Sequence, residues 1–179
     1  MNQKKDKKHA KPHVLHNSGN NEWYTPNKYI ERARRAMHSI DLDPASCNEA
    51  NRVVQADRFF TVLNNGLDQD WSGNVWLNPP YRQPLIKQFC NKLIESYRNG
   101  DIKQAIVLVN NATETLWGQK LLACASAVCF PARRIKFWRP NEKTATPLQG
   151  QMIIYFGDNI TRFSNAFVEN GVIYYSHAQ

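Results

Sequence analysis

The sequence lacks a long hydrophobic run, and its first twenty residues lack the apolar segment typical of a secretion leader. Its longest apolar stretches, such as Ala105–Val109 and Met152–Phe156, are far shorter than the roughly 20 residues that a membrane-spanning helix needs. A charged N-terminus stands where a secretory signal would carry an apolar segment. We therefore expect a cytoplasmic protein with no membrane partner.

The sequence also lacks closely spaced cysteines, because its four cysteines never form a Cys-x-x-Cys pair. This spacing disfavours a zinc site and a disulfide framework. We expect free thiols in a reducing compartment and no bound metal. The four residues are Cys47, Cys90, Cys124 and Cys129.

Acidic residues are comparatively few: 23 Lys and Arg against 15 Asp and Glu leave a net charge of +8 over 179 residues. This excess of positive charge favours a polyanionic partner, nucleic acid above all. A hydrophobic content of 42% excludes a wholly disordered chain. The length predicts one domain, with or without a tail.

Residues 1–20 differ in composition from the rest of the chain. They carry five lysines against the single acid Asp6, a local charge of 5 − 1 = +4, and show no apolar periodicity. We expect a disordered basic tail, which either tracks phosphates or only aids solubility, followed by one domain over residues 21–179.

Within that domain, strand-like and helix-like patterns alternate, which favours an α/β fold with a parallel sheet. Apolar residues at helical spacing predict helices over Lys28–Met37, Pro84–Tyr97 and Thr115–Cys124. Short apolar runs predict strands over Ser39–Asp43, Asn74–Leu77, Ala105–Val109, Ala127–Phe130 and Gln151–Phe156.

Polar or proline-rich clusters follow three of these strands: Asp43–Ser46, Asn78–Tyr81 and Asn110–Thr113. In open α/β sheets the ligand binds beyond the carboxyl ends of the strands. The three clusters therefore predict one shared site.

The cluster Asn78-Pro79-Pro80-Tyr81 is the most informative. Two prolines after an apolar strand hold the backbone in a rigid extended turn. Asn78 then presents an amide acceptor, the Pro79 carbonyl lies nearby, and Tyr81 offers a flat face. Such a set suits a planar ring that carries an exocyclic amine, although the same prolines could simply end a strand.

Asn-Pro-Pro-Tyr also resembles the catalytic motif of amino-methyltransferases that use S-adenosylmethionine. Five further segments match in order from about Glu22 to Gly157, and together they resemble the small phage-encoded DNA N6-adenine methyltransferase (Dam) family. These segments are Glu22–Pro26, Ile40–Ser46, Gly66–Leu67 with Trp71, Asn110–Thr115 and Arg134–Phe137.

The resemblance implies a trimmed Rossmann-like sheet, mostly parallel, with helices on both faces. It also implies S-adenosylmethionine as cofactor, double-stranded DNA as substrate and a phage or prophage gene in a bacterial host. The target adenine would be flipped out of the duplex. Asn78 and the Pro79 carbonyl would accept hydrogen bonds from the N6 amine ahead of in-line transfer, and Tyr81, after Pro80, would stack on the base.

The family pattern assigns the cofactor to two turns and to Asn78. Asp43 would face the cationic methionine end of the cofactor. The usual glycine-rich loop is absent, and little room is left between Ala50 and Trp71 for two strands, so Asp57 is the candidate for the ribose or adenine contact. The other cofactor residues are Trp23, Thr25, Pro26, Pro44, Ala45 and Ser46. Without the resemblance, Thr25-Pro26 is also typical of the start of a helix, and Asp43-Pro44 is also typical of a plain turn.

The segment from Arg133 to Arg139 packs four cations around two aromatic residues. We interpret it as a DNA contact, with cations on phosphate or guanine and an aromatic ring supporting the flipped base. An amphipathic edge strand with Ile135 and Phe137 inward is compatible with this role. The residues assigned to DNA are Arg133, Arg134, Lys136, Phe137, Trp138 and Arg139.

Two other functions stay open from the sequence. One is a nucleic-acid-binding module without catalysis, and the other is methylation of RNA adenine or protein glutamine. Readout of a DNA sequence would come from loops around Arg133–Thr146 or from a second subunit, so both a monomer and a dimer are open.

Overall fold

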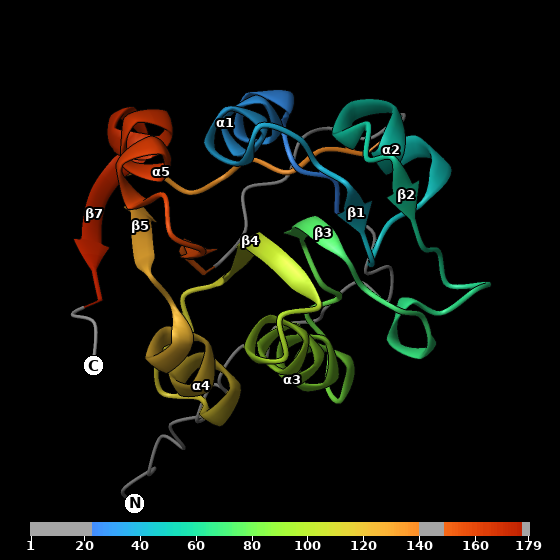
Figure 1. The fold of residues 1–179 in the computed structure, drawn as a ribbon. Coiled ribbons are helices and arrows are strands. Elements are labelled where there is room, and N and C mark those ends of the chain that lie inside the picture. Colours follow the sequence, from blue (N-terminus) through green and yellow to red (C-terminus); the bar gives the residue numbers. More distant parts are fainter. Residues whose placement is uncertain (1–22, 140–148, 177–179) are drawn as a thin grey trace, which may run out of the picture.

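The computed structural model describes residues 23–139 and 149–176. They form three layers, a central sheet with helices packed on both of its faces (Figure 1). The expected basic tail at residues 1–20 and residues 140–146 of the expected readout loop lie outside the described residues.

Within the described residues the sheet has seven strands in the order β2-β1-β3-β4-β6-β5-β7. The pairings β1–β2, β1–β3 and β3–β4 are parallel, whereas β6 is antiparallel to both β4 and β5, and β7 is antiparallel to β5. The strands are β1 (Leu42–Asp43), β2 (Arg58–Phe59), β3 (Gly73–Leu77), β4 (Ile102–Asn110), β5 (Ala127–Pro131), β6 (Gln151–Phe156) and β7 (Gly171–Tyr175).

Two helical layers cover this sheet. One layer holds α1 (Asn27–Met37), α2 (Asn48–Val54) and α5 (Ile160–Phe167), and the other holds α3 (Leu85–Arg98) and α4 (Leu116–Cys124) (Figure 1). Two short 3-10 turns, η1 (Gly66–Asp68) and η2 (Val168–Asn170), complete the described elements. The predicted α/β fold with helices on both faces is confirmed.

The strands divide their side chains between two hydrophobic cores because successive residues of a strand point to opposite faces. In β4, Ala105, Val107 and Val109 are buried in the core under α3 and α4. Ile106 and Leu108, which alternate with them, are buried in the core under α1 and α5. The short apolar run predicted as a buried strand is thus buried on both faces.

The first strand is shorter than predicted, because only Leu42–Asp43 of Ser39–Asp43 joins the ladder. The Asp41 side chain accepts a hydrogen bond from the Asn74 backbone N–H (2.8 Å), and Ser39 donates to the same carboxylate (2.6 Å). The residues before β1 therefore anchor the start of β3 instead of extending the sheet. Between Ala50 and Trp71, where little room was expected, the sheet gains only β2.

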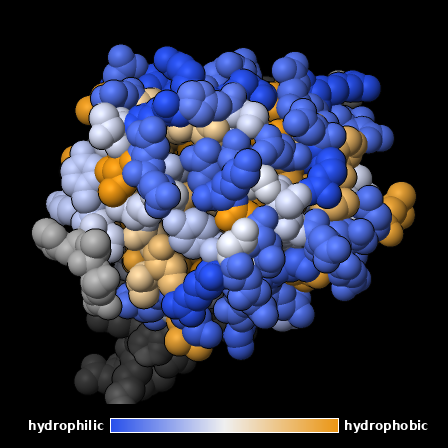
Figure 2. Space-filling model, in the orientation of Figure 1, coloured by the Kyte–Doolittle hydropathy of each residue, from blue (hydrophilic) through white to orange (hydrophobic). Residues whose placement is uncertain are grey.

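The surface in the orientation of Figure 2 is mainly hydrophilic, and its hydrophobic residues form small separate groups. No helix within residues 23–139 and 149–176 has the length and hydrophobicity to cross a bilayer.

Candidate functional site

The order in which the chain adds strands to the sheet reverses at β1, and the candidate site lies at this reversal. From β1 the chain moves outward to β2, then returns to β3 on the other side of β1. The carboxyl ends of β1 and β3 therefore flank a switch point, where open α/β sheets bind ligands. Asp43 ends β1, and Asn78 directly follows β3.

The half-buried Asn78 is held at both ends of its side-chain amide. Its Nδ2 donates to the Trp23 carbonyl (3.0 Å), and its Oδ1 accepts from the Tyr81 hydroxyl (3.0 Å). These two contacts set the orientation of the amide and distinguish its oxygen from its nitrogen. Because an amide oxygen has two lone pairs, Oδ1 can accept one further hydrogen bond.

Tyr81 packs into the fold more deeply than a surface aromatic residue. Its hydroxyl lies within hydrogen-bond distance of both Asn78 Oδ1 and the Leu108 carbonyl (3.2 Å). Burial strongly raises the pKa of this phenol, so the hydroxyl stays protonated and acts as a donor. The ring makes an edge-to-face contact with Phe137, with the centroids 6.4 Å apart.

The segment Trp23–Thr25 joins three parts of the site that are distant in sequence. Besides the Trp23 bond to Asn78, Tyr24 pairs with Trp138 in an isolated antiparallel bridge, and the Tyr24 hydroxyl accepts from the Cys47 thiol (3.2 Å). Trp138 Nε1 also donates to the Thr25 carbonyl (3.2 Å). The structure thus brings the predicted Trp23–Pro26, Asp43–Ser46 and Asn78–Tyr81 segments together.

Asp43 is a buried carboxyl group, 3% exposed, at the end of β1. Burial raises its pKa from 3.8 to about 7, although the Ser46 hydroxyl and the Ala45 backbone N–H favour the charged form. The Ala45 N–H lies 3.3 Å from Oδ1. The residues that the structure describes provide no Lys or Arg partner for this carboxylate. A buried carboxylate of this kind can form an ion pair with a cationic ligand.

Two buried hydroxyl groups lie in the same predicted segments and lack partners within the described residues. Thr25 Oγ1 and Ser46 Oγ are both inaccessible to solvent and make no hydrogen bond. The Ser46 hydroxyl is near enough to Asp43 to lower its pKa but does not meet hydrogen-bond geometry. Unpaired buried polar groups are costly, so both hydroxyls favour a polar ligand here.

Asp57 is not brought to this edge of the sheet. It is exposed and lies immediately before β2, level with Asp41, whereas the other predicted cofactor residues follow strand ends or belong to Trp23–Pro26. Asp57 is the one acid in the connection between α2 and β2, which otherwise holds Gln55 and Ala56.

The basic segment after β5 runs beside α1, on the same face of the sheet (Figure 1). Ile135 and Phe137 are buried in the core, whereas Arg133, Arg134 and Lys136 are exposed, so the side chains alternate as in the amphipathic interpretation. Because Phe137 is 3% exposed, it contacts Tyr81 rather than solvent. The Arg139 guanidinium stacks 3.9 Å above the Trp23 ring.

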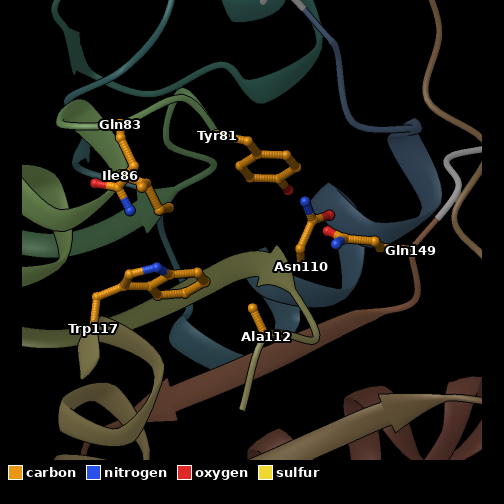
Figure 3. Close-up of a pocket in the computed structure, with 7 residues that line it drawn as sticks. All are labelled: Tyr81, Gln83, Ile86, Asn110, Ala112, Trp117 and Gln149. Atoms are coloured by element: carbon orange, nitrogen blue, oxygen red, sulfur yellow. The ribbon is translucent and has the colours of Figure 1, made fainter. Parts of the chain in front are cut away.

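A small open pocket of about 90 Å³ adjoins Tyr81 between the ends of β3 and β4 (Figure 3). Tyr81, Asn110 and Ala112 belong to the strand-end clusters that predict the shared site. Gln83, Ile86, Trp117 and Gln149 carry no such signal, because they come from loops and from the helices α3 and α4. The pocket is lined by Tyr81, Gln83, Ile86, Asn110, Ala112, Trp117 and Gln149.

Comparison with known proteins identifies relatives of the chain. The family model described as DNA N-6-adenine-methyltransferase (Dam) matches residues 13–168. The chain is also 33% identical over 93 residues to a DNA N-6-adenine-methyltransferase of Escherichia phage T1. That similarity covers 51% of this chain and 37% of the phage protein's length. In the described part of the chain no cluster of three or more His, Cys, Asp or Glu residues could hold a metal.

Proposed function

Because the chain belongs to the DNA N-6-adenine-methyltransferase (Dam) family, we propose that it methylates the N6 amine of adenine in double-stranded DNA, with S-adenosylmethionine as the methyl donor. The observation that carries this proposal is the orientation of Asn78 at the carboxyl end of β3, where Trp23 binds the amide nitrogen and Tyr81 binds the amide oxygen.

The residues around Asp43 fit the methionine end of this cofactor. A buried carboxyl group without a basic partner suits its ammonium group, and the unpaired hydroxyls of Thr25 and Ser46 suit its polar atoms. Pro26, Pro44 and Ala45 would shape the two turns that carry these groups, and Trp23 would close the site beside them. When bound here, S-adenosylmethionine supplies an electrophilic methyl group on a positively charged sulfur.

Asn78 and Pro79 would activate the adenine amine by accepting hydrogen bonds from its two N–H groups, one at Asn78 Oδ1 and one at the Pro79 carbonyl. These two bonds favour a tetrahedral nitrogen whose lone pair points at the methyl group. Pro80 would help to hold the Asn78 side chain and the Pro79 carbonyl in fixed positions, because its ring restricts the backbone. Because both acceptors would be in place before the reaction begins, they would lower its activation free energy.

Tyr81 would contribute its hydroxyl as well as its ring. Tyr81→Phe keeps the aromatic face but removes the donor to Asn78 Oδ1, so we expect kcat to fall about tenfold with little change in KM. Steady-state methylation kinetics would measure both constants. A variant with unchanged kcat would contradict the positioning role of the hydroxyl.

The segment Arg133–Arg139 would bind the DNA backbone. Arg133, Arg134 and Lys136 form its outward side, and Trp138 and Arg139 connect it to Thr25 and Trp23. Cations on phosphate contribute sequence-independent affinity that weakens with salt. The buried Phe137 would support the Tyr81 ring, which it contacts edge to face, instead of touching DNA.

Incubation of the purified protein with radiolabelled S-adenosylmethionine and duplex DNA tests the proposed function. We expect label in DNA as N6-methyladenine, identified after digestion to nucleosides. Parallel reactions with RNA and with a protein extract distinguish the other substrates. Label found only in RNA or protein would overturn the proposal, as would DNA binding without any transfer.

Asp43 provides a pH-dependent test of the cofactor site. The unfolded chain releases this proton near pH 3.8, but the folded protein releases it only near pH 7, so folding stability without cofactor declines as pH rises through this window. Asp43→Asn should therefore raise the Tm of the free protein at pH 8 but not at pH 3.5.

The same substitution should weaken binding of S-adenosylhomocysteine, which shares the ammonium group, at least about thirtyfold at pH 8. Wild-type affinity should increase from pH 6 to pH 8, whereas the variant should show no such increase. Calorimetric titration measures both, with the exposed Asp70→Asn as the matched control. Equal affinity of the Asp43→Asn variant and wild type would exclude contact between Asp43 and the ammonium group.

A further inference from the structure

Arg139 and Trp23 join the proposed DNA-binding segment to the catalytic turn. The Arg139 Cζ atom lies over the Trp23 ring, 3.9 Å from its centroid. The backbone carbonyl of Trp23 accepts the hydrogen bond from Asn78 Nδ2 (3.0 Å). A single residue therefore separates Arg139 from the side chain that would hold the adenine amine.

The contact between these two side chains is held in place by a pairing of the backbone. The Tyr24 N–H donates to the Trp138 carbonyl (3.1 Å), and the Trp138 N–H donates to the Tyr24 carbonyl (3.0 Å). The rings of the same two residues pack edge to face, with their centroids 5.1 Å apart. Because the bridge is antiparallel, its register places Trp23 opposite Arg139.

Arg139 differs in burial from the other cations of the segment from Arg133 to Arg139. The other three are exposed, whereas Arg139 is half-buried. Alternation along an extended segment places its side chain on the same side as that of Phe137, which contacts Tyr81. Arg139 is therefore the cation of this segment that faces the site.

A guanidinium group can stack on an aromatic ring and bind a phosphate at the same time. Its N–H groups lie in its plane, so its face can contact the ring while its edge donates to phosphate oxygens. A lysine ammonium group also binds phosphate, as a point charge, but it has no planar face. At a stacked position, Arg and Lys therefore carry the same charge but differ in geometry.

We infer that Arg139 is a positioning residue for methyl transfer, which binds a DNA phosphate with the edge of its guanidinium and steadies Asn78 through Trp23 with its face. This role rests on the proposed function, because it takes DNA as the substrate and Asn78 as the group that binds the amine. A phosphate that fixes Arg139 would restrict the Trp23 ring beneath it. The Trp23 carbonyl, and the Asn78 amide that it binds, would then be held more firmly when the duplex is in place.

Steady-state methylation at saturating S-adenosylmethionine separates this role from a purely electrostatic one. Arg139→Lys keeps the charge but loses the stack, so we expect kcat to fall about tenfold while KM for DNA stays within about twofold of wild type. Arg133→Gln removes an exposed cation of the same segment and should raise KM for DNA about threefold without lowering kcat. Arg139→Gln should change both constants.

Arg52→Lys is the matched control, because Arg52 is an exposed residue of α2 with no part in either proposal. Both of its constants should equal those of wild type. A wild-type kcat for the Arg139→Lys variant would overturn the positioning role, as would an equal fall in kcat for the Arg133→Gln variant.

A second measurement detects the link between Arg139 and Asn78 without turnover. Isotope-labelled protein is titrated with a duplex of G·C pairs only, which supplies phosphates but no adenine, while side-chain N–H signals are followed by NMR. We expect the Trp23 indole and Asn78 carboxamide signals to shift in wild type but not in the Arg139→Lys variant, although fluorescence anisotropy shows that both bind the duplex. The carboxamide of the exposed Asn99 is the internal control and should stay unchanged.

This role and the proposed function fail in different ways. If the G·C duplex shifts both signals in wild type alone but no DNA is methylated, the link between Arg139 and Asn78 stands and the proposed reaction is wrong. If DNA is methylated but the duplex shifts neither signal, or shifts both equally in the Arg139→Lys variant, the reaction stands and the role of Arg139 is wrong.

Discussion

Asn78→Ala is expected to lower kcat for DNA methylation about a hundred- to a thousandfold, while DNA binding persists. The substitution removes the Oδ1 acceptor that would hold the adenine amine, and a group arranged in advance at a reacting centre is typically worth this much in rate. Single-turnover transfer of labelled methyl groups measures the loss directly. Fluorescence anisotropy with a labelled duplex measures DNA affinity.

Stability should change much less in this variant, because Asn78 is half-buried and loses only the hydrogen bonds to Trp23 and Tyr81. Each such bond contributes about 1 kcal/mol. Asn99→Ala, at the exposed C-cap of α3, is a matched control that should retain full activity. Substantial methyl transfer by the Asn78→Ala variant would refute the role assigned to this side chain.

Gly66→Ala is expected to lower the free energy of unfolding by about 3 kcal/mol and to weaken S-adenosylhomocysteine binding. A Cβ atom at Gly66 would lie 1.9 Å from the Pro44 carbonyl oxygen, so one of the two backbone segments must move. Gly66 is also fixed from its other side, because Trp71 Nε1 donates to its carbonyl (2.8 Å). The displacement would therefore fall on the turn that carries Asp43.

Chemical denaturation and calorimetric titration measure these two effects. Gly150→Ala is the control, because its Cβ would meet nothing closer than Asn111 Cβ at 3.9 Å. An unchanged denaturation midpoint for the Gly66→Ala variant would show that the contact with Pro44 relaxes without cost.

The sheet could be predicted where local pattern and burial agree. Three strands are buried between the helical layers, and their apolar runs predict this burial. They are Gly73–Leu77, Ile102–Asn110 and Gln151–Phe156. Thr115 caps α4 with its hydroxyl, as its position before an apolar helix suggests. Two later elements, α5 and β7, are missing from the predictions although Asn159, Phe163 and Phe167 are typical of a capped amphipathic helix.

The outline of the site followed from strand ends, but its hydrogen bonds could not be foreseen. The Asn78 amide is oriented by the Trp23 carbonyl, and backbone carbonyls carry no sequence signal. Gln149 enters the pocket from the loop before β6, far from Asn110 in sequence. Its charge and its place in the chain favour Asp57 as a cofactor contact, but the structure places it before β2, where that strand begins.

The bridge between Tyr24 and Trp138 has a consequence for biosynthesis. These residues, and the Thr25–Trp138 pair with them, are separated by more than a hundred positions, so their contacts are among the most nonlocal in the fold. A chain emerging from the ribosome can form β3 and its Asn-Pro-Pro-Tyr turn long before Trp138 is available. Nonlocal contacts of this kind form late. A partly synthesised chain therefore contains the Asn-Pro-Pro-Tyr turn without the contacts between Trp138 and the Tyr24–Thr25 segment.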